Sequence, residues 1–204
     1  MAVASAPRRL LRDRFWHQGA TRHELMSFAD PALSTGRYHT MGGAGVWYAS
    51  DREQAAWAEL FRHFLDEGVD PFEVRRRVGA VDVQVEVLDL TDDAIVRSLG
   101  VNPADLVSDD YTTTQAVAEE ARRAGFAGIL APSAALPGRR TLVLFPPGVA
   151  NARPLLSRVR QPPPRMADLL GSIRLHRDVP AAVRSLLAAI TAAGGERIKR
   201  LRRR

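Results

Sequence analysis

Four polar residues in this chain combine side-chain types that could bind and cleave a molecule carrying both a phosphate and an aromatic ring. They are a cation, a phenol, a carboxylate and a hydroxyl: Arg37, Tyr48, Glu59 and Ser133. Each lies beside apolar sequence typical of buried structure, in the stretches GRYH, VWYAS, AELFRH and LAPSA. An arginine can clamp a phosphate through two hydrogen bonds, and a tyrosine offers both a ring face and a hydroxyl. We therefore take these four as candidate site residues.

Taken singly, each of these residues also has a structural explanation. An arginine such as Arg37 commonly forms a surface salt bridge, and a tyrosine such as Tyr48 commonly lies in the core with its hydroxyl at the edge. Glu59 could be a solvated helix residue, and Ser133 follows Pro132, as turn residues often do. The residue types alone leave both interpretations open, so the elements that position them matter.

The composition of the 204-residue chain excludes several classes of site. There is no cysteine, which excludes disulfides, thiolate nucleophiles and thiolate metal sites. The five histidines lack the spacing of metal ligands, and we expect no metal. No apolar run reaches the roughly 18 residues that span a bilayer, and no apolar segment follows the N-terminal arginines. We expect a cytoplasmic protein that makes no membrane contact.

The net charge of +6 conceals two regions of opposite sign. Residues 1–150 hold 16 basic and 20 acidic side chains, a net of −4, whereas residues 151–204 hold 13 and 3, a net of +10. We divide the chain into a globular domain at residues 1–155 and a basic, proline-containing linker, helix and tail at residues 156–204. The tail could contact nucleic-acid phosphates or an acidic partner, so a binding module is one alternative function.

Four short segments have the patterns of β-strands. Valines alternate with polar residues from 81 to 87, which predicts a half-exposed strand. Apolar runs rich in β-forming residues predict buried strands at 45–49, 128–131 and 141–145. The last two are joined by a short glycine-containing link, which indicates antiparallel pairing.

A capping box predicts the helix that carries the candidate carboxylate. Ser50 and Glu53 have the spacing of such a box, and the helix runs from there to about Asp66. Glu59 lies at the flank of its apolar stripe, where a carboxylate can face a cleft at the edge of the core.

Further helices follow from similar signals. Thr91 is the expected cap of a short helix, and Thr112 with Gln115 forms a capping box for another. Residues 161–165 predict a stiff extended linker, followed by a helix capped by Asp178. Strands and helices alternate irregularly, and Rossmann and P-loop motifs are absent, so we expect an α+β fold rather than a doubly wound sheet.

The ordered stretches GRYH, VWYAS, AELFRH, DDYTTTQAVAEEARRAGFAGILAPSA and TLVLF resemble the RES-domain family over about residues 13–147. That family is named after an arginine, a glutamate and a serine. The resemblance places them at Arg37, Glu59 and Ser133, with Tyr48 as the accompanying tyrosine. It implies an ADP-ribosyltransferase-like mixed or antiparallel sheet core with flanking helices, here followed by a basic helical C-terminal extension. It also implies the toxin of a toxin–antitoxin system that degrades NAD.

NAD as the substrate, without a metal, suits these residue types. Nicotinamide leaves as a neutral molecule, so its departure needs no general acid but places positive charge on the ribose. The Glu59 carboxylate would stabilise that charge, and Arg37 would clamp the pyrophosphate. Tyr48 would orient the nicotinamide, and Ser133 would hydrogen-bond the substrate rather than attack it. The predicted catalytic set is Glu59, Arg37, Tyr48 and Ser133, and the predicted NAD-binding set is Arg37, Tyr48, Ser133 and His39.

The sequence departs from the family pattern at two positions where a cation is usual. They are His17, in FWHQ, and Ala135, two residues after the serine. Arg139 or Arg140 could supply the missing charge. A catalytically degenerate RES-domain protein is therefore the second alternative function. The acceptor stays open among water, phosphate and protein, so the expected enzyme is a glycohydrolase, a phosphorylase or an ADP-ribosyltransferase-like enzyme.

The resemblance also implies protein partners. A cognate helix-turn-helix antitoxin would block the site. Family members often form dimers, and we expect a homodimer or a larger toxin–antitoxin complex.

Overall fold

The computed structural model describes residues 2–28, 34–67 and 69–175, together with residues 185, 188–190 and 192. The predicted helix cap Asp178 and the basic chain end at 193–204 lie outside the described residues. Within the part that is described, no helix is both long enough and apolar enough to cross a membrane.

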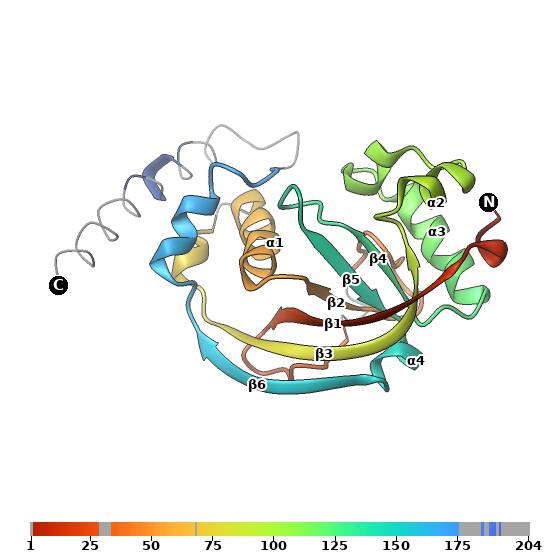
Figure 1. The fold of residues 1–204 in the computed structure, drawn as a ribbon. Helices are drawn as coiled ribbons and strands as arrows, with labels where there is room; N and C mark the ends of the chain where they lie inside the picture. Colours follow the sequence, from red (N-terminus) through yellow and green to blue (C-terminus); the bar gives the residue numbers. More distant parts are fainter. Residues whose placement is uncertain are drawn as a thin grey trace.

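The described residues form a six-stranded mixed sheet in the order β1-β2-β5-β4-β3-β6. β1 also pairs with β3, so five strands close into a ring and β6 lies outside it, along β3 (Figure 1). The pairing of β3 with β4 is parallel, and the other pairings are antiparallel. The strands are β1 (Arg8–Gly19), β2 (Trp47–Ser50), β3 (Arg76–Asp89), β4 (Gly128–Pro132), β5 (Arg140–Leu144) and β6 (Ala152–Arg160).

The long pair β1–β3 is the frame of the sheet. Its register runs from Arg8↔Leu88 to Gly19↔Arg77 without interruption. The alternation predicted for 81–87 is confirmed, because the odd-numbered valines are buried and Gln84 is exposed. The valines pack inside the ring against apolar residues of β1, β2, β4 and β5.

The predicted strands 128–131 and 141–145 correspond to β4 and β5, and their antiparallel pairing is confirmed. Alternate residues of these strands face two different cores. Leu130 and Leu142 face the ring interior, whereas Ile129 and Val143 pack beneath the helices α2 and α3. The expected α+β architecture of a sheet with flanking helices is confirmed.

Helix α1 (Glu53–Asp66) follows β2 after two residues, as predicted, but its N-terminus differs from the prediction. Ser50 is the last residue of β2, and Arg52 occupies the cap position without a side-chain hydrogen bond. The Glu53 side chain instead accepts a hydrogen bond from Trp57 Nε1 at 2.9 Å and pairs with Arg160. Packing against the neighbouring elements therefore replaces the capping box.

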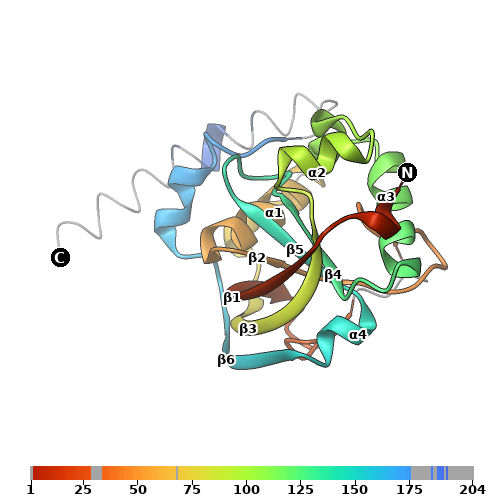
Figure 2. The same ribbon diagram turned by 45° about the vertical axis from the view of Figure 1, so that its right-hand side comes forward.

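The helices on the opposite side of the sheet are α2 (Asp93–Ser98) and α3 (Thr112–Arg123), and a short α4 (Pro146–Val149) follows β5 (Figure 2). Asp92, rather than the predicted Thr91, caps α2, with its carboxylate 2.8 Å from Ala94 N. Tyr111 occupies the cap position of α3, so the capping box predicted from Thr112 and Gln115 is wrong. The Gln115 side chain is free to reach another segment.

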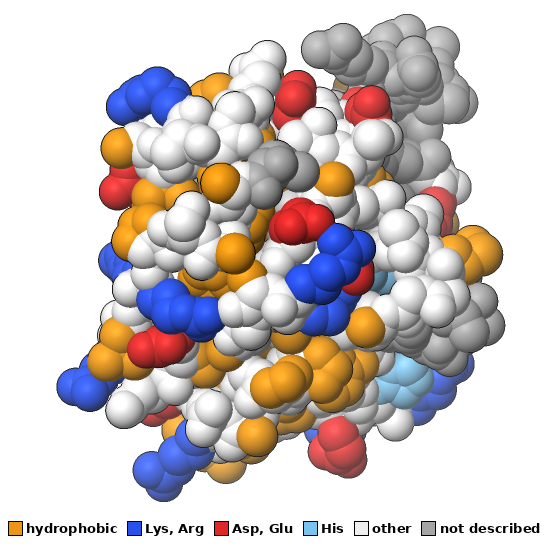
Figure 3. Space-filling view, turned by 90° about the vertical axis from the view of Figure 1, so that its right-hand side faces the viewer, with side chains coloured by type: hydrophobic (Ala, Val, Ile, Leu, Met, Phe, Trp, Pro, Cys, Tyr) orange, Lys and Arg blue, Asp and Glu red, His pale blue; other side chains and the backbone are white. Residues whose placement is uncertain are grey.

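Figure 3 shows basic and acidic side chains intermixed on the face to the right in Figure 1.

Strand β6 was missed because it is an exposed edge strand whose Leu156 is 87% exposed. It crosses the position between 155 and 156 at which we divided the sequence. The segment 161–165, predicted to be an extended linker, leads into a 3-10 turn at Pro164–Leu169. Met166 and Leu170 are buried in the same core as the apolar face of α1, so this part of the chain packs on the body.

Candidate active site

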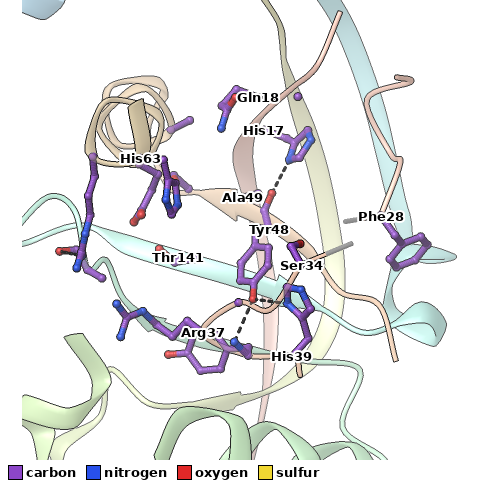
Figure 4. Close-up of a pocket in the computed structure, with 18 of the residues that line it drawn as sticks. His17, Gln18, Phe28, Ser34, Arg37, His39, Tyr48, Ala49, His63 and Thr141 are labelled. Carbon is purple, nitrogen blue, oxygen red and sulfur yellow. Dashed lines mark hydrogen bonds between the residues drawn. The ribbon is translucent and has the colours of Figure 1, made fainter. Parts of the chain in front are cut away.

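A pocket of about 560 Å³ lies between α1, the turn at residues 34–39 and the ends of β1, β2 and β3 (Figure 4). Arg37, His39, Tyr48 and Glu59 all line it, whereas Ser133 lies behind its wall. The structure thus brings together predicted residues that are separated by up to about a hundred positions of sequence. Other lining residues that matter below are His17, Gln18, Arg62, His63, Arg76 and Tyr111.

Arg37 sits in a tight turn in which Gly36 and His39 form an isolated β-bridge. Its Nη1 donates to the Ser108 carbonyl at 2.6 Å, and its guanidinium lies over the Tyr111 ring at 4.7 Å. No carboxylate among the described residues forms an ion pair with Arg37. Its positive charge is therefore oriented by neutral groups and can be neutralised by an anionic ligand.

The turn that carries Arg37 is fastened to α3 by Gln115. Gln115 Nε2 lies 2.9 Å from the Gly36 carbonyl and 3.2 Å from the His39 carbonyl. It also lies 3.0 Å from Thr35 Oγ1. Gly36 itself is required by close approach, because an added Cβ would lie 2.4 Å from the His39 ring. These contacts fix the backbone on both sides of Arg37.

Tyr48 and His39 form a hydrogen-bonded pair at the base of the pocket (Figure 4). The Tyr48 hydroxyl oxygen accepts from Tyr38 N at 3.0 Å and lies 3.0 Å from His39 Nδ1. Burial raises the pKa of Tyr48, so its hydroxyl keeps its proton at neutral pH. Burial also lowers the pKa of His39, which favours the neutral ring. The hydrogen bond between them therefore joins two neutral groups, and the pair is a preorganised wall of the pocket.

Glu59 is the one acidic residue among the described residues that line the pocket. Its Oε1 accepts a hydrogen bond from Ser133 Oγ at 2.8 Å and lies 3.4 Å from Ala135 N. Ser133 is only 1% exposed, and its Oγ accepts in turn from Leu136 N at 3.0 Å. In this arrangement Ser133 holds the carboxylate rather than facing the pocket. The direct contact of Ser133 with the substrate stays a prediction.

Arg62, one turn beyond Glu59 on α1, was not singled out from the sequence. It is 3% exposed, donates to the Ala134 carbonyl at 2.9 Å and forms an ion pair with Asp109. It therefore joins α1 to the loop after β4 and to the loop before α3. A buried guanidinium of this kind requires its partner, since an unpaired buried charge is costly.

His17 does not replace the cation that the family usually has at this position. Its Nδ1 donates to the Tyr48 carbonyl at 2.5 Å, and its ring stacks on Trp47 at 5.0 Å. Burial lowers its pKa to about 4, and the nearby Arg76 charge acts in the same direction. The ring is neutral at pH 7 and serves as a positioning group for β2.

The positive charge near His17 comes from β3. Arg76 lines the pocket and donates from Nε to Gln18 Oε1 at 2.8 Å. Arg140, proposed above as a substitute cation, is engaged elsewhere: it pairs with Asp51 at 3.3 Å and with Asp13 at 3.2 Å. Ala135, at the second departure, is buried in the core with α1.

The pocket therefore presents one carboxylate and three guanidinium groups, of which only that of Arg62 has a carboxylate partner among the described residues. Such a site can hold an anionic ligand and place a carboxylate beside a carbon that becomes positively charged. Within the described ranges, no group of three or more histidine or acidic side chains could hold a metal ion.

Comparisons with known proteins place this geometry in a family. The chain is 60% identical over 202 residues to a protein of Mycobacterium tuberculosis named a probable NAD(+) phosphorylase, covering 99% of this chain and 98% of that protein. The crystal structure of the M. tuberculosis MbcT–MbcA toxin–antitoxin complex contains a similar fold, with a TM-score of 0.69. The two chains are 21% identical, over 78% of this chain and 90% of that one. The model of the RES domain matches residues 6–166, so this chain belongs to the RES-domain family.

Proposed function

We propose that this protein cleaves the bond between nicotinamide and ribose in NAD, with inorganic phosphate as the preferred acceptor. The observation that carries the proposal is the Glu59 carboxylate, held by Ser133 and the Ala135 amide. The same pocket presents Arg37, which has no carboxylate partner among the described residues. The name of the 60% identical relative, a probable NAD(+) phosphorylase, supports phosphate over water or protein.

The reaction begins with a positively charged pyridinium nitrogen on the ribose carbon. When the bond breaks, its electron pair stays with that nitrogen, and nicotinamide leaves as a neutral molecule. Positive charge then develops on the ribose carbon and its ring oxygen. Glu59 is fixed in advance by two hydrogen bonds, so it stabilises this charge without reorganising. No residue needs to donate a proton to the leaving group.

The other residues bind and orient the dinucleotide. Arg37, held by Ser108 and Tyr111, contacts the pyrophosphate. Tyr48 and His39 present a neutral aromatic surface to the nicotinamide ring. Ser133 acts through Glu59 and forms no covalent bond with the substrate.

The proposed biological role is that of a toxin. The fold is similar to a chain of a toxin–antitoxin complex, which supports a protein antitoxin as partner, and we propose one of the helix-turn-helix type. A protein that consumes the NAD of its own cell acts in the cytoplasm. The closed sheet with α1 beside the site is consistent with an ADP-ribosyltransferase-like fold.

Nicotinamide release from NAD by the purified protein, with and without phosphate, tests this function. Wild type should release nicotinamide faster with phosphate and form a phosphorylated ADP-ribose, identified by mass spectrometry. Glu59→Gln removes the charge but keeps the shape, so it should abolish release while the circular dichroism spectrum is unchanged. A folded wild type that releases no nicotinamide in either buffer would show that the protein is a degenerate family member.

The basic region at 156–204 supports a second candidate function, contact with nucleic acid. Residues 151–204 carry a net charge of +10, and contacts with nucleic acid are electrostatic and weaken with salt. Deletion of 196–204 should leave NAD cleavage unchanged. DNA binding that weakens with salt, and that is lost on this deletion, would favour the second function.

A further inference from the structure

Two arginines in the pocket lack a carboxylate partner among the described residues, and they lie at different ends of it. Figure 4 shows Gln18, the hydrogen-bond partner of Arg76, at one end and Arg37 at the other, with Tyr48 between them. Each guanidinium is oriented by neutral groups: Arg37 by the Ser108 carbonyl and Arg76 by the Gln18 amide. Each of the two guanidinium groups therefore presents a positive charge that an anion could neutralise.

Arg76 lies near the C-terminal half of α1, beyond Glu59. Its guanidinium carbon is 6.0 Å from the centre of the Phe64 ring. His63, a pocket residue, and Phe64 come four and five residues after Glu59, about 6 and about 7.5 Å further along the helix axis. Glu59 and Arg76 therefore line the same pocket from neighbouring parts of α1 and β3.

The contact with Gln18 leaves donors for a ligand. Arg76 uses Nε to reach Gln18 Oε1, and neither of its Nη atoms forms an ion pair with a described residue. The Gln18 amide nitrogen lies on the same side chain as the accepting oxygen, so it adds a further N–H beside the guanidinium. Partial burial lowers the pKa of Arg76, although an arginine remains charged at neutral pH. An anion would relieve the cost of burying this charge.

NAD carries a single pyrophosphate, which Arg37 accounts for. We propose that Arg76 and Gln18 form a separate subsite for the attacking inorganic phosphate. This inference rests on the proposed function and adds where the second substrate binds. It also explains why a neutral His17 is tolerated: the cation comes from the adjacent strand β3.

In the reaction step that the subsite serves, one bond forms at the ribose carbon and one breaks. A phosphate oxygen forms a bond to the ribose carbon while the bond from that carbon to the pyridinium nitrogen breaks. The electron pair of the broken bond neutralises the nitrogen, so nicotinamide and a phosphorylated ADP-ribose are the products. Arg76 stays protonated throughout and acts by holding the phosphate opposite the leaving group.

Steady-state kinetics with Arg76→Gln tests the subsite. The KM for phosphate, measured at saturating NAD, should rise on the order of tenfold to a hundredfold, because charge-assisted hydrogen bonds are lost. The KM for NAD should change less than about threefold. Arg75→Gln is the matched control, since Arg75 is exposed, is the preceding residue and lies outside the pocket lining. It should behave as wild type.

A second variant guards against a folding defect. Gln18→Glu keeps the side-chain size and places a carboxylate on the guanidinium, so it should raise the KM for phosphate as Arg76→Gln does. A rise in the KM for NAD instead would assign Arg76 to the dinucleotide and overturn the subsite. If wild type releases nicotinamide at a rate that does not depend on phosphate, the subsite is also overturned, but NAD cleavage itself still stands. No release at all would instead refute the proposed function.

Discussion

Replacement of Ser133 by alanine separates two roles for this residue. In the structure Ser133 Oγ donates to Glu59 at 2.8 Å and accepts from Leu136 N at 3.0 Å, and it is buried. A residue that attacks the substrate is indispensable, because its loss removes the reaction path. A residue that holds the Glu59 carboxylate is not, because the carboxylate remains without it.

The size of the effect follows from the hydrogen bonds. One hydrogen bond to a charged group contributes about 1.5–3 kcal/mol, and each 1.4 kcal/mol corresponds to a factor of ten in rate. The Ala135 amide, at 3.4 Å from Glu59, keeps part of the orientation. Ser133→Ala should therefore lower kcat about tenfold to a hundredfold with little change in the KM for NAD. The buried Leu136 N–H also loses its acceptor, which should cost about 1–3 kcal/mol of stability.

Nicotinamide release gives the kinetic constants, and urea unfolding gives the free energy of unfolding of the same preparation. Mass spectrometry of protein quenched during turnover should find no adduct on Ser133. A folded Ser133→Ala variant without detectable activity would refute a role confined to positioning. An unchanged kcat would show that Glu59 does not depend on this hydrogen bond.

Three further predictions concern the framework around the site. Gln115→Ala removes the contacts that hold the turn of Arg37, so the KM for NAD should rise several-fold while kcat falls less, as steady-state kinetics would show. Asp109→Ala leaves the buried Arg62 unpaired and should cost about 3 kcal/mol in urea unfolding, a loss that the added change Arg62→Met should partly restore. The pKa of His17 is about 4 in the folded state and about 6.5 when unfolded. Above pH 6.5 the ring is neutral in both states, so His17 takes nothing from the free energy of unfolding. About 3 kcal/mol should be lost as pH falls from 6.5 to 4, and a stability–pH profile of His17→Phe should lack this loss.

The elements that the sequence predicted well are those in which local pattern and tertiary environment agree. The valine alternation of 81–87 and the short apolar runs of β4 and β5 are buried in the register expected of them. Arg37, Tyr48 and Glu59 became candidates because the family resemblance fixed their order along the chain, and all three line one pocket.

The parts that could not be predicted depend on contacts between distant segments. Gln115 has the spacing of a capping residue, yet its amide reaches a turn 76 to 80 positions earlier. Arg76 is the middle of three consecutive arginines, and only the pairing of β3 with β1 brings it beside Gln18. Strand β6 is an exposed edge with weak alternation, so its own sequence gives little signal.

The contacts around Glu59 have a consequence for the timing of activity during synthesis. The carboxylate is set by Ser133, 74 positions later, and the adjacent Arg62 is bound to the Ala134 carbonyl, 72 positions later. A nascent chain that has left the ribosome only as far as β3 has its glutamate but not the groups that aim it. The candidate site is therefore complete only once β4 and the loop after it have emerged from the ribosome.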